Sequence, residues 1–130
     1  MARRAEYRPG LSRAAQMLSL AAERLRLHGN ETMSAADLRS EVERTGGCRP
    51  GSVLPSDFCY NRLNRDPNSG RHCLFEWLGK GLYRYLGPGC PYTGSVYWRP
   101  GRRGTETIVG EWREGVRTLT HDPREGAGED

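Results

Sequence analysis

Residues 74–87 read Leu-Phe-Glu-Trp-Leu-Gly-Lys-Gly-Leu-Tyr-Arg-Tyr-Leu-Gly. Two β-forming runs separated by a short, glycine-containing turn are typical of a β-hairpin. In the second run, alternation puts Arg84 and two leucines on one face and two tyrosines on the other. The stretch therefore predicts a hairpin with Lys80 at its tip.

Two helices are expected upstream of the hairpin. Residues 11–28 repeat leucine at seven-residue intervals beside pairs of alanines, and Gly29 ends the pattern. The second helix starts after Ser34, which is a good N-cap, and Asp37 stands three residues on as in a capping box. Both helices have an apolar face, which predicts that they pack on a common core.

The segment 52–65, which contains Pro-Ser-Asp-Phe-Cys-Tyr-Asn-Arg-Leu-Asn, predicts a third helix. Pro55 suits a first helical turn, because the missing N–H of proline costs nothing there. The face left exposed carries short hydrogen-bonding side chains, an aromatic ring and arginine. A solvated helix normally carries Glu and Lys, so this face indicates contact with a partner.

Further strands are expected at 95–98, 105–112 and 116–119. The fold class is therefore α+β, with three helices, a hairpin and an additional C-terminal β segment. With 130 residues the chain has room for one core, which we place in residues 11–120. Residues 1–10 are expected to form a flexible basic arm and residues 121–130 a disordered acidic tail.

The net charge of +4, from 20 basic and 16 acidic residues, is unevenly distributed. Residues 45–105 carry nine basic and three acidic side chains, whereas residues 106–130 carry three basic and seven acidic ones. Every basic residue except Lys80 is arginine, whose planar guanidinium suits phosphate groups and guanine edges. The excess of arginine over lysine reflects genome composition, but its location indicates a surface that binds a polyanion.

Several classes of protein are excluded. No apolar run approaches the ~18–20 residues of a membrane span, and the first residues, Met-Ala-Arg-Arg, lack an apolar signal core. We therefore expect a cytoplasmic protein with no membrane partner. Sequence motifs of hydrolases, P-loop proteins, zinc proteases and zinc deaminases are missing, so we expect no catalytic residue, no enzymatic activity and no cofactor.

The four cysteines at positions 48, 59, 73 and 90 contain no closely spaced pair of the kind that zinc ribbons use. We expect reduced, partly buried thiols and no metal. Two disulfides, or a zinc site that uses His72 and Cys73 with distant partners, are the alternatives.

Three helices followed by a two-stranded hairpin is the order of a winged helix-turn-helix, and residues 11–86 resemble that DNA-binding superfamily. The hairpin 74–87 is similar to the wing of small bacterial winged-helix modules attached to restriction and chromatin proteins. The stretches 55–64 (PSDFCYNRLN), 81–87 (GLYRYLG) and 91–98 (PYTGSVYW) also resemble a bacterial domain family of unassigned function.

The winged-helix resemblance implies that helix 52–65 enters the major groove of double-stranded DNA, and that the protein is associated with the nucleoid. The implied base contacts are Ser56, Asp57, Tyr60, Asn61 and Asn64. The implied contacts to the DNA backbone are Arg3, Arg4, Arg62, Arg65, Lys80, Arg84, Arg99, Arg102 and Arg103. Tyr92, Tyr97 and Trp98 are either core aromatics or a stacking surface for a modified, for example methylated, base.

Two other functional classes stay open. Winged helices also serve as docking or dimerisation modules, in which case a second copy or a catalytic partner protein meets the polar face. Glu76, Glu106 and Glu111, with Lys80, are the residues from which a small metal-dependent nuclease would be built, although their spacing does not demand it. Asp57 is also explained by stabilisation of its own helix start.

Overall fold

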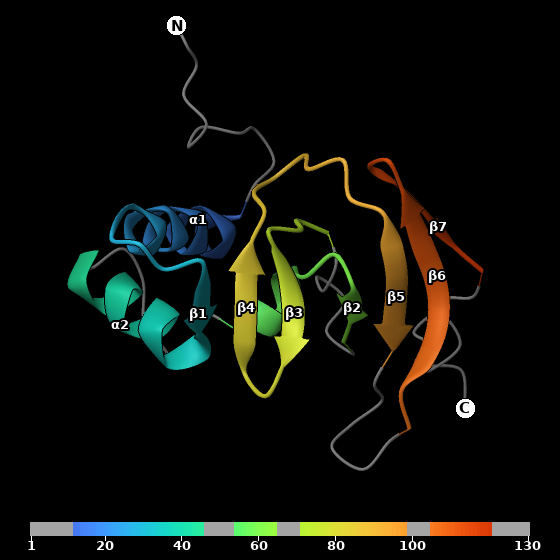
Figure 1. Ribbon diagram of the computed structural model, residues 1–130, viewed down its shortest axis with the longest axis horizontal. Coiled ribbons are helices and arrows are strands. Elements are labelled where there is room, and N and C mark those ends of the chain that lie inside the picture. The colour runs from blue at the N-terminus through green and yellow to red at the C-terminus, as the bar shows by residue number, and fades with distance from the viewer. Residues whose placement is uncertain (1–11, 46–53, 65–70, 99–104, 121–130) are drawn as a thin grey trace, which may run out of the picture.

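The computed structural model describes residues 12–45, 54–64, 71–98 and 105–120 (Figure 1). Within these ranges the chain forms two α-helices, one short 3-10 turn and seven strands. The helical elements are α1 (Arg13–Leu27), α2 (Ala35–Thr45) and η2 (Pro55–Phe58). The strands are β1 (Thr32–Ser34), β2 (Arg62–Leu63), β3 (Phe75–Gly79), β4 (Leu82–Tyr85), β5 (Gly94–Trp98), β6 (Thr107–Arg113) and β7 (Val116–Leu119).

The strands form two sheets that meet at the segment leading into β2. One sheet has the order β1-β4-β3 and the other β2-β5-β6-β7. Cys59 forms a parallel bridge with Phe75, and Tyr60 N donates to Phe75 O at 2.8 Å. Asn61 O in turn accepts from Tyr97 N at 3.0 Å. The seven strands therefore follow one another as one curled surface, with both α-helices beyond β1 (Figure 1).

The prediction of a three-helix winged helix-turn-helix is wrong. The segment assigned to the third helix, 52–65, forms the single turn η2 and then extended chain in the part that the structure describes, residues 54–64. Its backbone groups pair with β3 and β5 rather than within a helix, since Leu74 N donates to Phe58 O at 2.7 Å. Ser, Asp and Asn side chains compete for backbone groups and weaken a helix, so strand pairing prevails here.

Other local predictions are confirmed. The hairpin β3–β4 turns at Lys80, whose φ is 55°. The capping box of α2 is reciprocal, because Ser34 Oγ accepts from Asp37 N at 3.0 Å and Asp37 Oδ2 accepts from Ser34 N at 3.3 Å. The expected C-terminal strands are present as β5, β6 and β7. Strand β1 was not predicted, since three residues are too few to show a periodic pattern.

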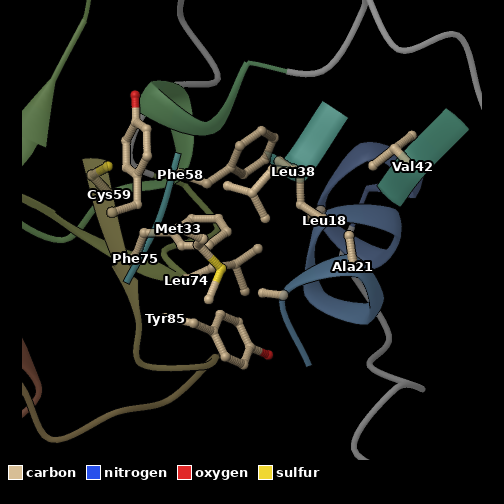
Figure 2. Close-up of a cluster of buried hydrophobic side chains, with 13 residues drawn as sticks. Leu18, Ala21, Met33, Leu38, Val42, Phe58, Cys59, Leu74, Phe75 and Tyr85 are labelled. Atoms are coloured by element: carbon tan, nitrogen blue, oxygen red, sulfur yellow. The ribbon is translucent and has the colours of Figure 1, made fainter. Parts of the chain in front are cut away.

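The main core lies between the two α-helices and one face of the first sheet. Figure 2 shows Leu18 of α1 and Leu38 of α2 directed toward Phe75 and Met33 of the sheet side. These side chains are all at most 1% exposed, so each contributes about 1.5–3 kcal/mol to folding by the hydrophobic effect. A second, smaller core around Leu63 and two valines lies within the second sheet.

Among the described residues, no helix has the length and hydropathy needed to span a bilayer.

Candidate functional site

Arg62 and Trp77 form a stacked pair where the two sheets meet. The guanidinium carbon of Arg62 lies 4.2 Å from the centroid of a Trp77 ring, which is the geometry of a cation–π contact. Arg62 is on β2 and Trp77 on β3, and both side chains are partly exposed. Contacts of this kind contribute about 0.5–2 kcal/mol and hold the guanidinium plane against the ring.

Asn64 holds the other side of the Arg62 guanidinium. Arg62 Nε donates to Asn64 Oδ1 at 3.1 Å. Asn64 Nδ2 contacts three acceptors of η2, namely Ser56 O at 3.1 Å, Ser56 Oγ at 3.2 Å and Asp57 Oδ1 at 2.9 Å. The turn η2 therefore fixes the amide plane of Asn64, and Asn64 fixes the arginine.

The side chain of Asn61 holds the backbone of Trp77. Asn61 Nδ2 donates to Trp77 O at 2.9 Å, and Trp77 N donates to Asn61 Oδ1 at 2.8 Å. The side-chain amide thus takes the place of a strand residue and satisfies both polar groups of the Trp77 backbone. Ser56, Asp57, Asn61 and Asn64, which we expected to meet DNA bases, are brought together around the Arg62–Trp77 pair.

Tyr60, the fifth expected base contact, is 2% exposed and lies at the centre of another cluster. Its hydroxyl donates to Gly87 O at 2.6 Å and accepts from Cys90 N at 2.9 Å. Burial raises the pKa of Tyr60 to about 12, although the hydrogen bond from Cys90 N favours the ionised form. Trp112 Nε1 donates to Tyr60 O at 2.7 Å. The hydroxyl and the backbone carbonyl of Tyr60 therefore both bond within the protein.

The three aromatic side chains predicted as a stacking surface do not all lie on one face. Tyr92 stacks on Tyr60 with 5.2 Å between ring centroids and donates to Glu76 Oε2 at 3.0 Å. Burial raises the pKa of Tyr92, and the bond to Glu76 raises it further. Tyr97 and Trp98 are neighbours in β5, so they point to opposite faces, and Trp98 packs on the second core.

Of the predicted backbone contacts, three lie in the described ranges. Lys80 is exposed at the hairpin turn, and Arg62 is stacked as above. Arg84 donates to Glu76 Oε1 at 2.7 Å. Arg3, Arg4, Arg65, Arg99, Arg102 and Arg103 lie outside the described residues.

Three strands end at the same edge of the curled surface. Strand β2 is parallel to β5, and the segment before β2 is parallel to β3. The carboxyl ends of β2, β3 and β5 therefore point the same way, as their arrowheads show in Figure 1. Lys80 follows β3 directly, and Arg62 stands on β2 at this edge. Residues 65–70 and 99–104 come next in sequence after Asn64 and Trp98, and they contain four arginines and one aspartate.

Three of the four cysteines lie in the described residues. Cys59, Cys73 and Cys90 are free, and among the described residues no group of three His, Cys, Asp or Glu side chains is placed to hold a metal. Burial raises the pKa of Cys73 to about 11, whereas the charge of Arg117 favours its thiolate. Cys73 and Cys90 line a half-open pocket of about 270 Å³ with His72 and Trp112.

Sequence reasoning did not single out Trp77 as part of a site. Its alternation within β3 indicates a core-facing position, and it does pack against the main core. It becomes part of the candidate site because Arg62, 15 positions away, reaches it through the pairing of the segment before β2 with β3. No local pattern in the sequence reports that approach.

Comparison with known proteins shows the family to which the chain belongs. The sequence model of one family, described as "Domain of unknown function (DUF7225)", matches residues 15–119. A curated relative, "Uncharacterized protein YnaC" of Bacillus subtilis (strain 168), is 37% identical over 90 residues. The match covers 69% of this chain and 34% of the relative, so the chain spans about a third of that protein. No solved structure matches the chain significantly.

Proposed function

Since the chain belongs to the DUF7225 family, whose description assigns no activity, we propose a function from the geometry of the site. We propose that the protein binds double-stranded DNA. The binding surface is the edge where β2, β3 and β5 end. The resemblance to a bacterial domain family of unassigned function is confirmed by this membership, and the winged-helix mode of binding is withdrawn with the fold. DNA therefore meets strand ends and a hairpin turn rather than a recognition helix.

The observation that carries the proposal is the shared direction of the three strands. It puts exposed Lys80 and partly exposed Arg62 at the edge from which segments 65–70 and 99–104 continue. Arg65, Arg99, Arg102 and Arg103, which are far apart in sequence from Lys80, thus follow from neighbouring strand ends. Basic side chains such as Arg62 and Lys80 supply the phosphate contacts on which most DNA affinity depends.

Two acidic groups near this edge are hydrogen-bonded within the protein, whereas Glu106, which precedes the residue paired with Trp98, is exposed. Ala35 N donates to Gly81 O at 3.1 Å, so α2 begins beside the hairpin turn. Asp37, in the first turn of α2, accepts a hydrogen bond from Ser34 N at a carboxylate oxygen. Asp57 likewise accepts from Asn64. In sequence, the basic residues on and directly after these strands outnumber the acidic residues there, which favours a polyanion; the basic ones are Arg62, Arg65, Lys80, Arg99, Arg102 and Arg103, and the acidic ones are Asp66 and Glu76, with Asp57 and Glu106 close by in sequence.

The test is a fluorescence titration of labelled duplex DNA at two salt concentrations with the wild type and two charge reversals. Lys80→Glu is at the proposed edge. Arg113→Glu, on an exposed side chain at the opposite end of β6, is the matched control with the same change in net charge. Near 0.1 M salt we expect Lys80→Glu to lose about tenfold in affinity and Arg113→Glu about threefold or less.

The logarithm of the affinity should also fall steeply with the logarithm of the salt concentration, by about 0.9 per phosphate contact. A wild-type protein that leaves duplex DNA unbound at low salt would contradict the proposal. Equal losses of affinity in the two variants would contradict this edge as the binding surface. A methylated copy of the same duplex in parallel shows whether a modified base adds affinity.

A further inference from the structure

We infer that Arg62 is a preformed phosphate-binding group, whose two terminal nitrogens take two oxygens of one backbone phosphate. The inference rests on the proposed DNA binding and adds to it the anchoring contact. Arg62 differs in this from Lys80, which is exposed at the hairpin turn. Arg62 is held on a ring face and at Nε at once.

The contacts of Arg62 leave the useful side of the guanidinium open. Trp77 covers one face at 4.2 Å, and Asn64 Oδ1 occupies Nε at 3.1 Å. No residue in the described ranges accepts a hydrogen bond from the two terminal nitrogens. Those nitrogens still reach solvent, because the described part of the chain has no buried side-chain nitrogen without a partner. The open side is the fork that binds phosphate or carboxylate in a bidentate manner.

The partners of Arg62 are themselves immobilised. Asn64 is fixed by Ser56 and Asp57, at distances between 2.9 and 3.2 Å. Trp77 is fixed through two backbone bonds to Asn61, at 2.8 and 2.9 Å. An arginine side chain loses much conformational freedom when it binds a ligand, and here that loss has already occurred on folding. Four polar residues thus serve to hold one guanidinium.

A phosphate fits this arrangement better than a base edge does. The guanidinium is partly buried and lies against Trp77, so it is reached by groups that project from the partner. Phosphate oxygens project from the duplex, whereas base edges lie at the floor of the grooves. Arginine also keeps its charge at every relevant pH, which a phosphate ligand requires.

The first test uses the wild-type protein and inorganic phosphate. In a nitrogen–proton NMR spectrum of the arginine Nε–H groups, the Arg62 signal, assigned by its loss in Arg62→Lys, should shift in a saturable way. The Arg24 signal is the internal control, because its Nε is likewise bonded, to Glu41 Oε2 at 3.0 Å. The reference titration adds sodium chloride to equal ionic strength. An Arg62 signal that follows Arg24, or that moves equally with chloride, would overturn the inference.

The second test compares two substitutions that keep the charge. Arg62→Lys removes the fork and the ring contact, so duplex affinity should fall about tenfold. Lys80→Arg makes the reverse change at an exposed turn and should leave the affinity within about twofold of the wild type. Unchanged binding by Arg62→Lys would overturn the phosphate role while DNA binding stands. A wild type that binds phosphate at Arg62 but no duplex would contradict the proposed function and keep the phosphate site.

Discussion

The guanidinium of Arg62 lies over the ring of Trp77 at 4.2 Å, and this pair joins the two sheets of the protein. Arg62 belongs to β2 of the four-stranded sheet, and Trp77 belongs to β3 of the three-stranded one. Asn61 and Asn64, on either side of Arg62 in sequence, hydrogen-bond to this pair and remain partly exposed. Their contribution is therefore to stability and to the orientation of one arginine, which can be measured separately.

Asn61→Ala should lower the free energy of unfolding by about 2 kcal/mol, because it leaves both polar groups of the Trp77 backbone without partners. Asn30→Ala is the matched control, since Asn30 is exposed and makes one side-chain bond, to Leu25 O at 2.9 Å. It should cost less than about 1 kcal/mol. Urea unfolding measures both values, and equal losses would contradict the role of Asn61 as a strand substitute.

Ser34→Ala should destabilise the protein by about 1 kcal/mol, because it removes the acceptor for Asp37 N from the capping box of α2. Ser40→Ala, at an exposed position inside the same helix, should change stability by less than about 0.5 kcal/mol. Thermal or urea unfolding of both variants provides the comparison. A loss in Ser40→Ala as large as in Ser34→Ala would argue against the cap.

Gly110→Ala should cost more than about 2 kcal/mol, because the new Cβ would lie 2.5 Å from Thr118 O and 2.9 Å from Leu119 Cα. These atoms belong to the backbone of β7 and cannot rotate away. Gly29→Ala meets open space and suffers only from a φ of 94°, so it should cost about 1 kcal/mol. Urea unfolding measures both losses. A loss in Gly29→Ala as large as the loss in Gly110→Ala would contradict the steric argument.

Stability should fall as the pH rises from about 10 to about 12. Burial raises the pKa values of Tyr60 and Tyr83 from the ordinary 10.0 to about 12, so the folded state retains protons that the unfolded state has lost. Their stabilising effect is fully present below pH 10 and is lost as the pH passes the folded values. In Tyr60→Phe the free energy of unfolding should fall less steeply with pH than in the wild type, even if the variant is less stable at neutral pH. Urea unfolding at several alkaline pH values checks this, and an unchanged slope would contradict it.

The hairpin, α1, the capping box and the C-terminal strands were predictable because each depends on neighbours in sequence. Alternation divides β4 into two faces, and in the structure Tyr83 and Tyr85 are buried whereas Leu82 and Arg84 are exposed. The second helix begins where Ser34 and Asp37 form their reciprocal bonds. Patterns of this kind involve interactions over a few residues, which the amino acids themselves control.

The segment 54–64 was misread because its structure depends on distant partners. Pro55 does begin a helical turn, but that turn ends at Phe58 and the chain then pairs with β3 and β5. Polar residues that suggest a reading surface when placed on a helix become internal supports when placed on extended chain. A change of secondary structure therefore reverses which side chains are available to a partner.

The amino-acid sequence by itself determined the local elements, the basic character of the region 45–105 and the family resemblance that residues 15–119 confirm. The tertiary structure alone decided that β2, β3 and β5 end at one edge, and that Arg62 meets Trp77 there. The physical reason is that strand pairing satisfies backbone groups of segments remote in sequence. The same pairing placed four of the five expected base contacts, all except Tyr60, around the Arg62–Trp77 pair.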